Sequence, residues 1–237
     1  MTAIWAVLPA AGAGSRFGGG IPKQYLEVAG LPLIAYALDA LLAHPAVDGA
    51  MVAIAADDPH WPGWTSRSGK PVRTCVGGSE RARSVLAALD ALDDVTDDAL
   101  VLVHDAARPC LDAVDLDRLI AAAAGNGDGA LLAAPVRDTL KRASQGRSAG
   151  TMPREQLWRA LTPQLARLGT LREALRDALD AGLVVTDEAM ALEHAGLHPQ
   201  LVEGREDNIK VTTPADLALV EFLLARRAGR ADTRPVA

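Results

Sequence analysis

Near its start the chain reads Ala3-Ile4-Trp5-Ala6-Val7-Leu8, then Pro9-Ala10-Ala11-Gly12-Ala13-Gly14-Ser15-Arg16-Phe17, then Gly18-Gly19-Gly20-Ile21-Pro22-Lys23-Gln24-Tyr25-Leu26. The apolar run predicts a buried strand that leads into a long glycine-rich loop. Glycines allow backbone N–H groups to turn inward and to approach a ligand closely. Arg16 and Lys23 add two cations to this loop. The segment therefore predicts a phosphate-binding loop, and a nucleotide as its ligand.

Three kinds of glycine loop are considered for this segment. Gln24 after the lysine excludes a Walker A loop, which ends in Gly-Lys-Ser/Thr. Phe17 stands where a dinucleotide-binding fingerprint has its third glycine, and the glycines and proline that follow would break the helix of that motif. The looser spacing Gly12, Gly14, Gly18 leaves a dinucleotide site open. A plain strand-to-helix turn without a ligand is a further alternative. The third kind is the loop of a nucleotidyltransferase.

Length and composition limit the class of protein. A chain of 237 residues predicts one α/β domain, and 49% hydrophobic residues exclude disorder. No apolar run reaches the ~18–20 residues that a membrane helix needs, and the N-terminus lacks the basic start of a signal peptide. Cys75 and Cys110 are typical of a reducing compartment, in which no disulfide between them is expected. We therefore expect a cytoplasmic protein without a membrane partner.

The formal net charge is −6. A nucleic-acid-binding surface requires a basic stripe, so we expect no nucleic-acid partner. The basic residues near the motifs are few and local, which favours a small anionic substrate.

Apolar segments alternate with helical patterns along the chain. We predict strands at Ile4–Leu8, Ala50–Ala55, Val72–Val76, Leu100–Val103, Ala130–Ala134 and Gln200–Val202. We predict helices at Leu33–Ala43, Glu80–Leu92, Ala113–Ala123, Leu168–Ala181, Asp187–His194 and Pro214–Arg227. This alternation indicates an α/β fold with a doubly wound, mostly parallel sheet, in which ligands bind beyond the carboxyl ends of the strands.

We expect a single domain over residues 1–228 and a flexible tail over 229–237. Within the domain, residues 137–156 are polar and poor in core side chains. A long excursion of this kind is either functional or an interaction element. Thr213 is the expected N-cap of the last helix, and Thr186 is the expected cap of the helix before it.

Two segments that follow predicted strands carry candidate binding residues. In Gly77-Gly78-Ser79-Glu80-Arg81, Ser79 is either a helix cap or part of a base-recognition loop, in which Gly78 and the hydroxyl of Ser84 would read a pyrimidine edge. Asp105 is either a turn aspartate or a carboxylate for a metal or a ribose hydroxyl. We interpret His104 as a packed, hydrogen-bonded histidine rather than a base.

Three further side chains are candidates for binding an anion or a metal. Arg108 is a permanent cation near the Asp105 carboxylate, which suits phosphate binding. Lys210 lies between apolar neighbours, so its ammonium either points at a ligand or reaches along the surface to water. Asp207 is a second carboxylate that would lie beside a metal.

Several motifs resemble one family of enzymes. Pro-Ala-Ala-Gly-x-Gly-x-Arg-Phe followed by Pro-Lys-Gln-Tyr-Leu resembles the signature of sugar-nucleotide-type transferases. Its Pro-Lys-Gln-Tyr form is similar to the 2-C-methyl-D-erythritol 4-phosphate cytidylyltransferase family. Matching segments also occur at residues 77–84, 103–109, 134–141, 161–164 and 204–212, so the resemblance extends from Leu8 to about Leu224.

The resemblance implies a fold, substrates and partners. The fold is the Rossmann-like nucleotidyltransferase fold with a protruding β-arm at residues 137–156, which two subunits of a homodimer exchange. CTP is the implied co-substrate, 2-C-methyl-D-erythritol 4-phosphate the acceptor, and Mg²⁺ the ion that bridges the phosphates. The alternatives are another acceptor, such as ribitol 5-phosphate, and a nucleotide-binding protein without catalysis, against which the retained cations argue.

The same resemblance implies roles for individual residues. It implies catalytic roles for Arg16, Lys23, Arg154 and Lys210. It implies CTP contacts from Pro9, Ala10, Ala11, Gly12, Ala13, Gly14, Gly78, Ser79, Ser84, Asp105 and Ala106. It implies acceptor contacts from Asp105, Arg108, Thr139, Thr162 and Asp207, and Asp105 is also the candidate metal ligand.

Overall fold

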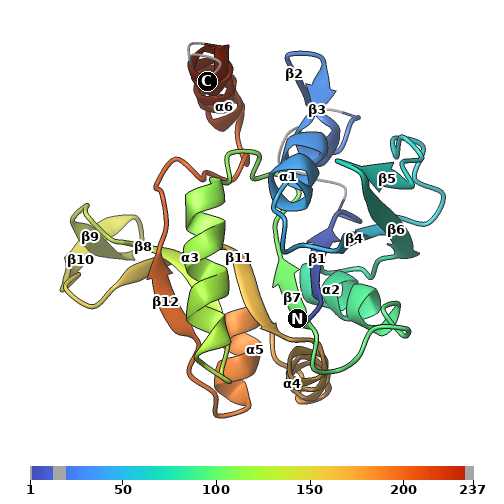
Figure 1. Cartoon of the computed structure of the whole chain (residues 1–237). Helices are drawn as coiled ribbons and strands as arrows, with labels where there is room; N and C mark the ends of the chain where they lie inside the picture. The colour runs from blue at the N-terminus through green and yellow to red at the C-terminus, as the bar shows by residue number, and fades with distance from the viewer. Residues whose placement is uncertain (1, 13–19, 233–237) are drawn as a thin grey trace.

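The computed structural model describes residues 2–12 and 20–232, and an eight-stranded sheet runs through it (Figure 1). The strand order is β12-β8-β11-β7-β1-β4-β6-β5. The strands are β1 (Ile4–Pro9), β4 (Gly49–Ile54), β5 (Ser66–Arg67), β6 (Lys70–Val76), β7 (Leu100–Val103), β8 (Ala130–Pro135), β11 (Trp158–Arg167) and β12 (Gln200–Glu203).

The helices and the short strands complete the fold. The helices are α1 (Leu33–Leu42), α2 (Arg81–Asp90), α3 (Ala113–Ala124), α4 (Leu168–Asp180), α5 (Glu188–His194) and α6 (Pro214–Asp232), with the 3₁₀ turn η2 (Lys23–Tyr25). Two small hairpins stand outside the large sheet, β2 (Glu27–Val28) with β3 (Leu31–Pro32), and β9 (Leu140–Ser144) with β10 (Arg147–Met152).

Strand β1 lies near the centre of the sheet and sends alternate side chains to opposite faces. It pairs in parallel with β4 and β7. Ile4, Ala6 and Leu8 join the core under α1 and α3, while Trp5 and Val7 join the core under α2, α4 and α5. Because both faces are covered by helices, the strand is apolar at every position, as its sequence predicts. The doubly wound α/β sheet is thereby confirmed.

One central strand was missed by the sequence analysis. Strand β11 runs antiparallel to both β7 and β8, which makes the sheet mixed rather than wholly parallel. Its first residues are exposed, it shows no clean alternation, and it contains Pro163, a residue that argues against a central strand. The register with β8 shifts between Ala160 and Gln164, and Pro163, which has no N–H to donate, lies within that shift.

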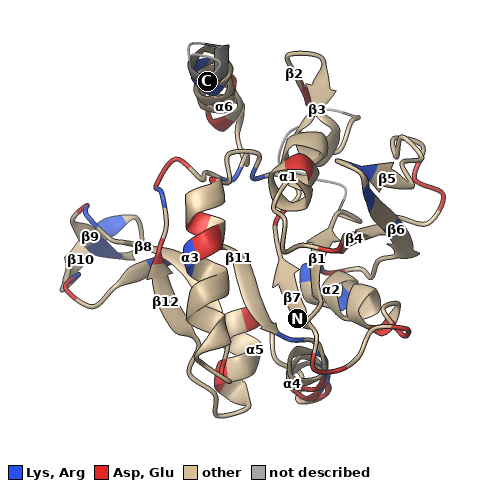
Figure 2. Ribbon diagram, viewed as in Figure 1, with Lys and Arg blue, Asp and Glu red and all other residues tan. Residues whose placement is uncertain are grey.

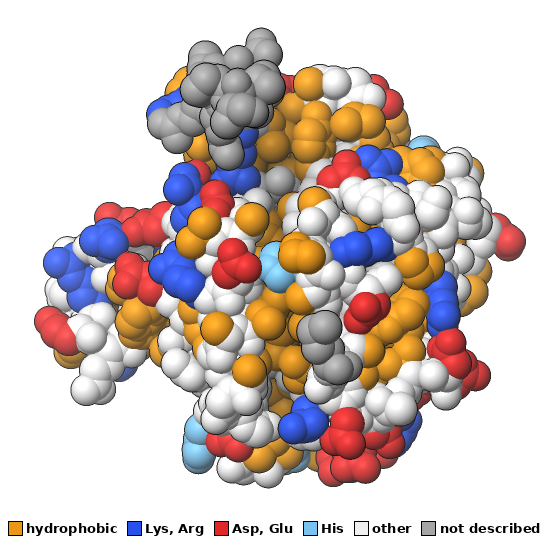
Figure 3. Space-filling model, in the orientation of Figure 1, with side chains coloured by type: hydrophobic (Ala, Val, Ile, Leu, Met, Phe, Trp, Pro, Cys, Tyr) orange, Lys and Arg blue, Asp and Glu red, His pale blue; other side chains and the backbone are white. Residues whose placement is uncertain are grey.

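Residues 137–156 form a projecting arm built on the β9–β10 hairpin (Figure 1). All ten residues from 141 to 150 are exposed. The hairpin is basic and therefore blue in Figure 2, since it carries Lys141, Arg142 and Arg147. Figure 3 shows it projecting beside the body of the molecule. At its base the Arg154 guanidinium donates to the carbonyl oxygen of Arg137.

The helix ends correct two expectations. Asp187, and not Thr186, caps α5, because its carboxylate accepts from the N–H of Met190 at 3.0 Å. Ser79 is not a helix cap either, since the N-cap of α2 is Glu80.

At the other end of the chain, α6 begins at Pro214 as predicted, with the Thr213 hydroxyl accepting from the N–H of Asp216. The helix continues to Asp232, so the first four residues of the expected flexible tail are helical. Cys75 and Cys110 are free thiols, as expected.

Candidate active site

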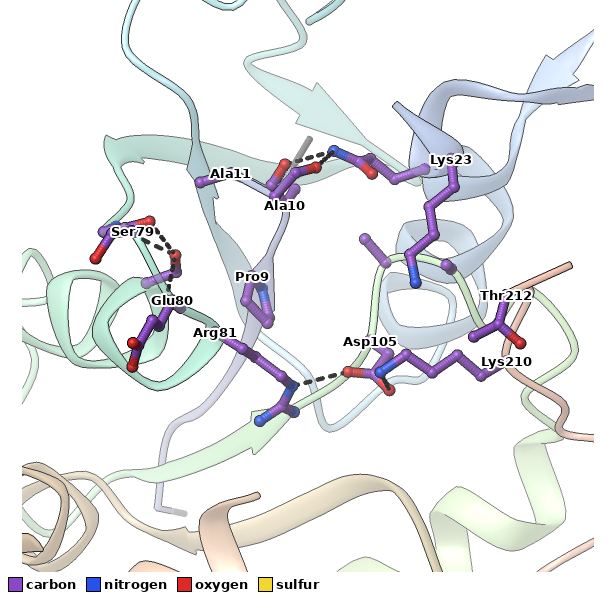
Figure 4. A pocket seen from close by; sticks show the side chains of 16 residues that line it. Pro9, Ala10, Ala11, Lys23, Ser79, Glu80, Arg81, Asp105, Lys210 and Thr212 are labelled. Carbon is purple, nitrogen blue, oxygen red and sulfur yellow. Dashed lines mark hydrogen bonds and ion pairs between the residues drawn. The ribbon is translucent and has the colours of Figure 1, made fainter. Parts of the chain in front are cut away.

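A cavity of about 540 Å³ opens beyond the carboxyl ends of β1, β6 and β7. Its wall includes residues that lie about 200 positions apart in the chain. The lining residues that matter most for its chemistry are Ala10, Gly12, Lys23, Gln24, Arg81, Asp105 and Lys210. Figure 4 shows that Arg81 and Lys210 reach the Asp105 carboxylate from opposite sides, while the Lys23 side chain points into the same cavity.

The glycine-rich loop leaves β1 at the edge of this cavity. Pro9, Ala10, Ala11 and Gly12 line the cavity as the sequence predicts. Ala13, Gly14 and Arg16, to which the sequence also gives binding and catalytic roles, lie outside the described residues. The described chain continues at Gly20 and enters η2, from which the Lys23 side chain points into the cavity (Figure 4).

The loop between β6 and α2 forms another wall, and it is closely packed. The Ser84 hydroxyl accepts from the N–H of Gly78 at 3.2 Å and lies 3.1 Å from the carbonyl oxygen of Glu80. A Cβ atom on Gly77 would stand 2.5 Å from the Cβ of Ala11, so only glycine allows this loop to touch the glycine-rich loop. Gly78, Ser79 and Ser84 all line the cavity.

Asp105 is the charged centre of the site. It is only 6% exposed, and its carboxylate faces three cations. Arg81 Nε donates to Oδ1 at 3.0 Å, while Arg108 Nε and Lys210 Nζ approach Oδ2 at 3.1 and 3.0 Å. Burial alone would raise the pKa of this carboxyl, but the three cations outweigh burial and hold the pKa well below its usual range. Asp105 is therefore ionised at every physiological pH.

Lys210 reaches Asp105 because its segment joins the loop after β7. The N–H of Val211 donates to the carbonyl oxygen of Ala107 at 2.9 Å. This bond ties the segment between β12 and α6 to the Asp105 loop. The apolar neighbours of Lys210 are thus part of a packed segment, and its ammonium lies at the cavity rather than on the outer surface.

The sequence does not single out the ion pair between the partly buried Arg81 and the buried Glu188. Arg81 Nη1 and Nη2 donate to the two carboxylate oxygens of Glu188 at 2.6 and 3.0 Å, and Glu188 is 1% exposed. Burial would lower the pKa of Arg81, but Glu188 and Asp105 raise it above its usual value. All three guanidinium nitrogens are used, so Arg81 serves to orient Asp105. A fully buried carboxylate cannot be recognised from sequence spacing alone.

A hydrogen-bonded chain supports Asp105 from behind. The N–H of Asp105 donates to the Thr162 hydroxyl at 3.1 Å, and that hydroxyl lies 2.9 Å from His104 Nδ1. His104 Nε2 lies 3.0 Å from the carbonyl oxygen of Arg108, so Nε2 donates and Nδ1 accepts. His104 is wholly buried, which confirms that it is a packed histidine and not an exposed base.

Five residues with predicted roles do not line the cavity. Thr162 and Arg108 lie behind Asp105, and Asp207 faces Arg205 and Arg227. Thr139 and Arg154 belong to the exposed arm. Their predicted contacts with substrate are proposals that need a second subunit or a change of side-chain position.

The cavity offers few side chains that could bind a metal ion. The carboxylates that line the cavity are Glu80 and Asp105. Both oxygens of Asp105 already face cations, and the described part of the chain contains no group of three or more His, Cys, Asp or Glu side chains that could hold an ion. These residues do not fit an ion held by the protein alone.

Comparison with known proteins decides between the candidate glycine loops. The family model described as IspD, 2-C-methyl-D-erythritol 4-phosphate cytidylyltransferase, matches residues 4–226. The chain belongs to this family. A family member from Xanthomonas campestris pv. campestris (strain 8004) is 64% identical over 226 residues, which cover 94% of this chain and 85% of that protein. One from Stenotrophomonas maltophilia (strain K279a) is 62% identical, with 96% and 99% covered.

Solved structures of the cytidylyltransferase family support the same family assignment. The Francisella tularensis enzyme superposes with a TM-score of 0.81 at 34% identity and covers 94% of this chain and 100% of that one. The Thermus thermophilus enzyme superposes with a TM-score of 0.76 at 32% identity, with 95% and 98% covered. The glycine-rich loop is thus that of a nucleotidyltransferase, and the chain is an enzyme of cytidylyl transfer. Among the helices that the structure describes, none is long and apolar enough to cross a membrane.

Proposed function

We propose that the cavity transfers CMP from CTP to 2-C-methyl-D-erythritol 4-phosphate. Pyrophosphate leaves, and 4-diphosphocytidyl-2-C-methyl-D-erythritol forms. The observation that carries the proposal is that Lys23 and Lys210 line one cavity at the end of the sheet, beside a buried Asp105 that Arg81 and Lys210 hold. Such fixed cations match a reaction between two phosphate groups.

In the proposed reaction an oxygen of the acceptor phosphate attacks the α-phosphorus of CTP. A P–O bond forms on the attacked side, and the bond from the α-phosphorus to its bridging oxygen breaks on the other side. The acceptor phosphate is already ionised at neutral pH, so no general base is required. Catalysis then depends on alignment and on stabilising the charge that builds on the phosphate oxygens.

Each wall of the cavity is given a part in this reaction. The backbone of Pro9–Gly12, continued by Ala13 and Gly14, holds the triphosphate, and Gly78, Ser79 and Ser84 read the cytosine. Asp105 and Ala106 face the ribose. Lys23 and Arg16 stabilise the transition state, and Lys210 binds the acceptor phosphate. A divalent cation, carried mainly by the phosphates of CTP, neutralises charge on them.

The arm completes the site in a homodimer. Thr139 and Arg154 do not line the cavity of their own chain, and an exposed two-stranded hairpin has little stability by itself. We therefore assign the arm to the second subunit, whose acceptor site Thr139 and Arg154 reach. Arg108, Thr162 and Asp207 act through the groups that they hold. The cytoplasmic location remains a prediction.

The proposal is tested by pyrophosphate release from the purified chain with Mg²⁺. Each of the four ribonucleoside triphosphates is combined with methylerythritol phosphate or with ribitol 5-phosphate. Release with CTP and methylerythritol phosphate alone is the expected result. Faster turnover of ribitol 5-phosphate would replace the proposed acceptor and keep the chemistry, and the absence of release with either acceptor would contradict the proposal.

A further inference from the structure

Gln24 is a buried amide at the cavity wall, between the two parts of the site that meet the phosphates. It is 4% exposed and directly follows Lys23 in the turn η2. Its Nε2 donates to the carbonyl oxygen of Ala10 at 2.6 Å and to that of Gly12 at 3.1 Å. These bonds are dashed near the Ala10 label in Figure 4. One side chain thus connects the start of the glycine-rich loop with the turn that carries Lys23.

Both hydrogens of the amide are used on main-chain oxygens. Carbonyl oxygens that face a triphosphate repel it, because each carries the negative end of a dipole. A hydrogen bond from Gln24 offsets this charge at Ala10 and at Gly12. The Ala10 oxygen is also buried, so leaving it without a donor would cost free energy.

The far side of the turn is fixed as well. The Tyr25 hydroxyl donates to Asp58 Oδ2 at 2.8 Å, and the Tyr25 ring lies 5.6 Å from that of His60. Lys23 therefore stands on a turn whose next two side chains anchor it to two separate segments. Small displacements matter at this position, since a shift of about 1 Å in a reacting group can lower a rate by about a hundredfold.

We propose that Gln24 is a positioning residue of the transfer reaction. Its amide sets the distance between the start of the glycine-rich loop and the Lys23 ammonium, so that both meet the same phosphate group. The inference rests on the function proposed above for this cavity. It assigns to Gln24 an effect on turnover that is exerted through Lys23.

A double-mutant cycle tests this coupling. Gln24→Met keeps the length of the side chain and removes both donors. We expect it to lower kcat roughly tenfold in the otherwise unchanged enzyme, and by less than about twofold when Lys23 is already alanine, because the residue on which Gln24 acts is then missing. KM for CTP should change less than kcat. Gln24→Glu, which also removes the amide donors, provides a second variant if Gln24→Met does not fold.

The control is Tyr36→Phe, which also removes one bond from a side chain to a main-chain oxygen. The Tyr36 hydroxyl donates to Val28 at 2.7 Å, outside the lining of the cavity. The Tyr36→Phe variant should have a lower Tm and an unchanged kcat. All variants are assayed at a temperature at which circular dichroism shows them folded.

The proposed function and the role of Gln24 fail separately. An unchanged enzyme that releases no pyrophosphate from CTP and methylerythritol phosphate contradicts the proposed function. An active enzyme whose folded Gln24 variants keep kcat within about twofold, or lose the same factor with and without Lys23, overturns the role of Gln24 alone.

Discussion

His104 makes the stability of the fold depend on pH. Burial lowers the pKa of its imidazole from the usual 6.5 to about 4. In the unfolded chain the ring takes up a proton near pH ~6.5, whereas in the folded protein it stays neutral until about pH 4. Between these values the unfolded state binds more protons, so stability falls as the pH is lowered. The loss amounts to about 3 kcal/mol over the window.

Urea unfolding at a series of pH values measures this effect. We expect the free energy of unfolding to decline from pH 6.5 toward pH 4, and His104→Gln to flatten that decline. His198→Gln replaces an exposed histidine and should keep the slope of the unchanged protein. If the free energy of unfolding of His104→Gln declined as steeply as that of the unchanged protein, another group would be responsible for the pH dependence.

Lys23 is the residue on which turnover should depend most directly. Lys23→Ala removes a cavity-lining cation that we propose stabilises the transferred phosphate. By analogy with the loss of one oxyanion donor, the cost is about 3–4 kcal/mol, or roughly a hundredfold to a thousandfold in kcat. Steady-state kinetics measure it, and circular dichroism checks the fold.

Lys70→Ala is the matched control for Lys23. The Lys70 ammonium bonds to the carbonyl oxygen of His44, away from the cavity. The Lys70→Ala variant should keep the kcat of the unchanged enzyme. Near-normal turnover of Lys23→Ala would remove Lys23 from the mechanism.

The site could be predicted from the sequence where short motifs concentrate the chemistry. Lys23 and Ser84 lie within or beside glycine-rich loops and do line the cavity. Gln24 and Glu188 were not assigned roles, because their importance depends on burial and on partners far away in the chain. Thr162 was expected at the substrate, and the structure shows it behind Asp105 instead.

At the scale of the element, a single ion pair joins the start of α2 to the start of α5. Glu188→Gln leaves the partly buried Arg81 short of a charge partner, and for a fully buried pair such a loss costs about 3–5 kcal/mol. We expect a value at the lower end, since Asp105 remains as a partner. Denaturant unfolding measures the change.

Asp94→Asn is the matched control, because Arg73 and Asp94 form the same two-pronged pair on the surface. It should leave the free energy of unfolding nearly unchanged. A Glu188 variant that is as stable as this control would argue against a structural role for the buried pair.

The arm is the second element that calls for a test. Leu140 and Met152 face each other across the base of the hairpin, so a short Gly-Ser link can replace the residues between them. We expect the full chain to scatter light as a dimer of the 24.7 kDa monomer, and the armless variant as a monomer.

The armless variant should also lose acceptor turnover while CTP still raises its Tm, because the arm lies outside the nucleotide part of the cavity. A full chain that is monomeric at micromolar concentration would contradict the exchange of arms.

The predicted elements agree with the structure wherever one local pattern governs the conformation. The apolar run of β1 and the caps of α6 are of this kind. Strand β11 could not be predicted in this way, because its first three residues are exposed and the next six are buried between β7 and β8. Strand β11 pairs with β7, about 60 residues away in the chain, and with β8, about 30 residues away. A local pattern does not report pairing over such distances.

At the scale of the whole molecule, removal of metal should separate activity from stability. The described residues offer no clustered ligands for an ion, so EDTA should leave the Tm of the free protein unchanged. If the ion arrives with CTP, as proposed, EDTA should abolish pyrophosphate release and an excess of Mg²⁺ should restore it. A drop in the Tm of the free protein on chelation would reveal an ion held by the protein.

During synthesis, the residues that line the cavity become available at different times. The glycine-rich loop leaves the ribosome well before Lys210 and Thr212, which line the opposite wall. Val211 can bond to Ala107 only when β12 has added its edge to the sheet. A nascent chain can thus bury most of its core while its catalytic centre is still open. A polypeptide released before residue 210 would lack α6 as well as Lys210, and we expect it to be inactive.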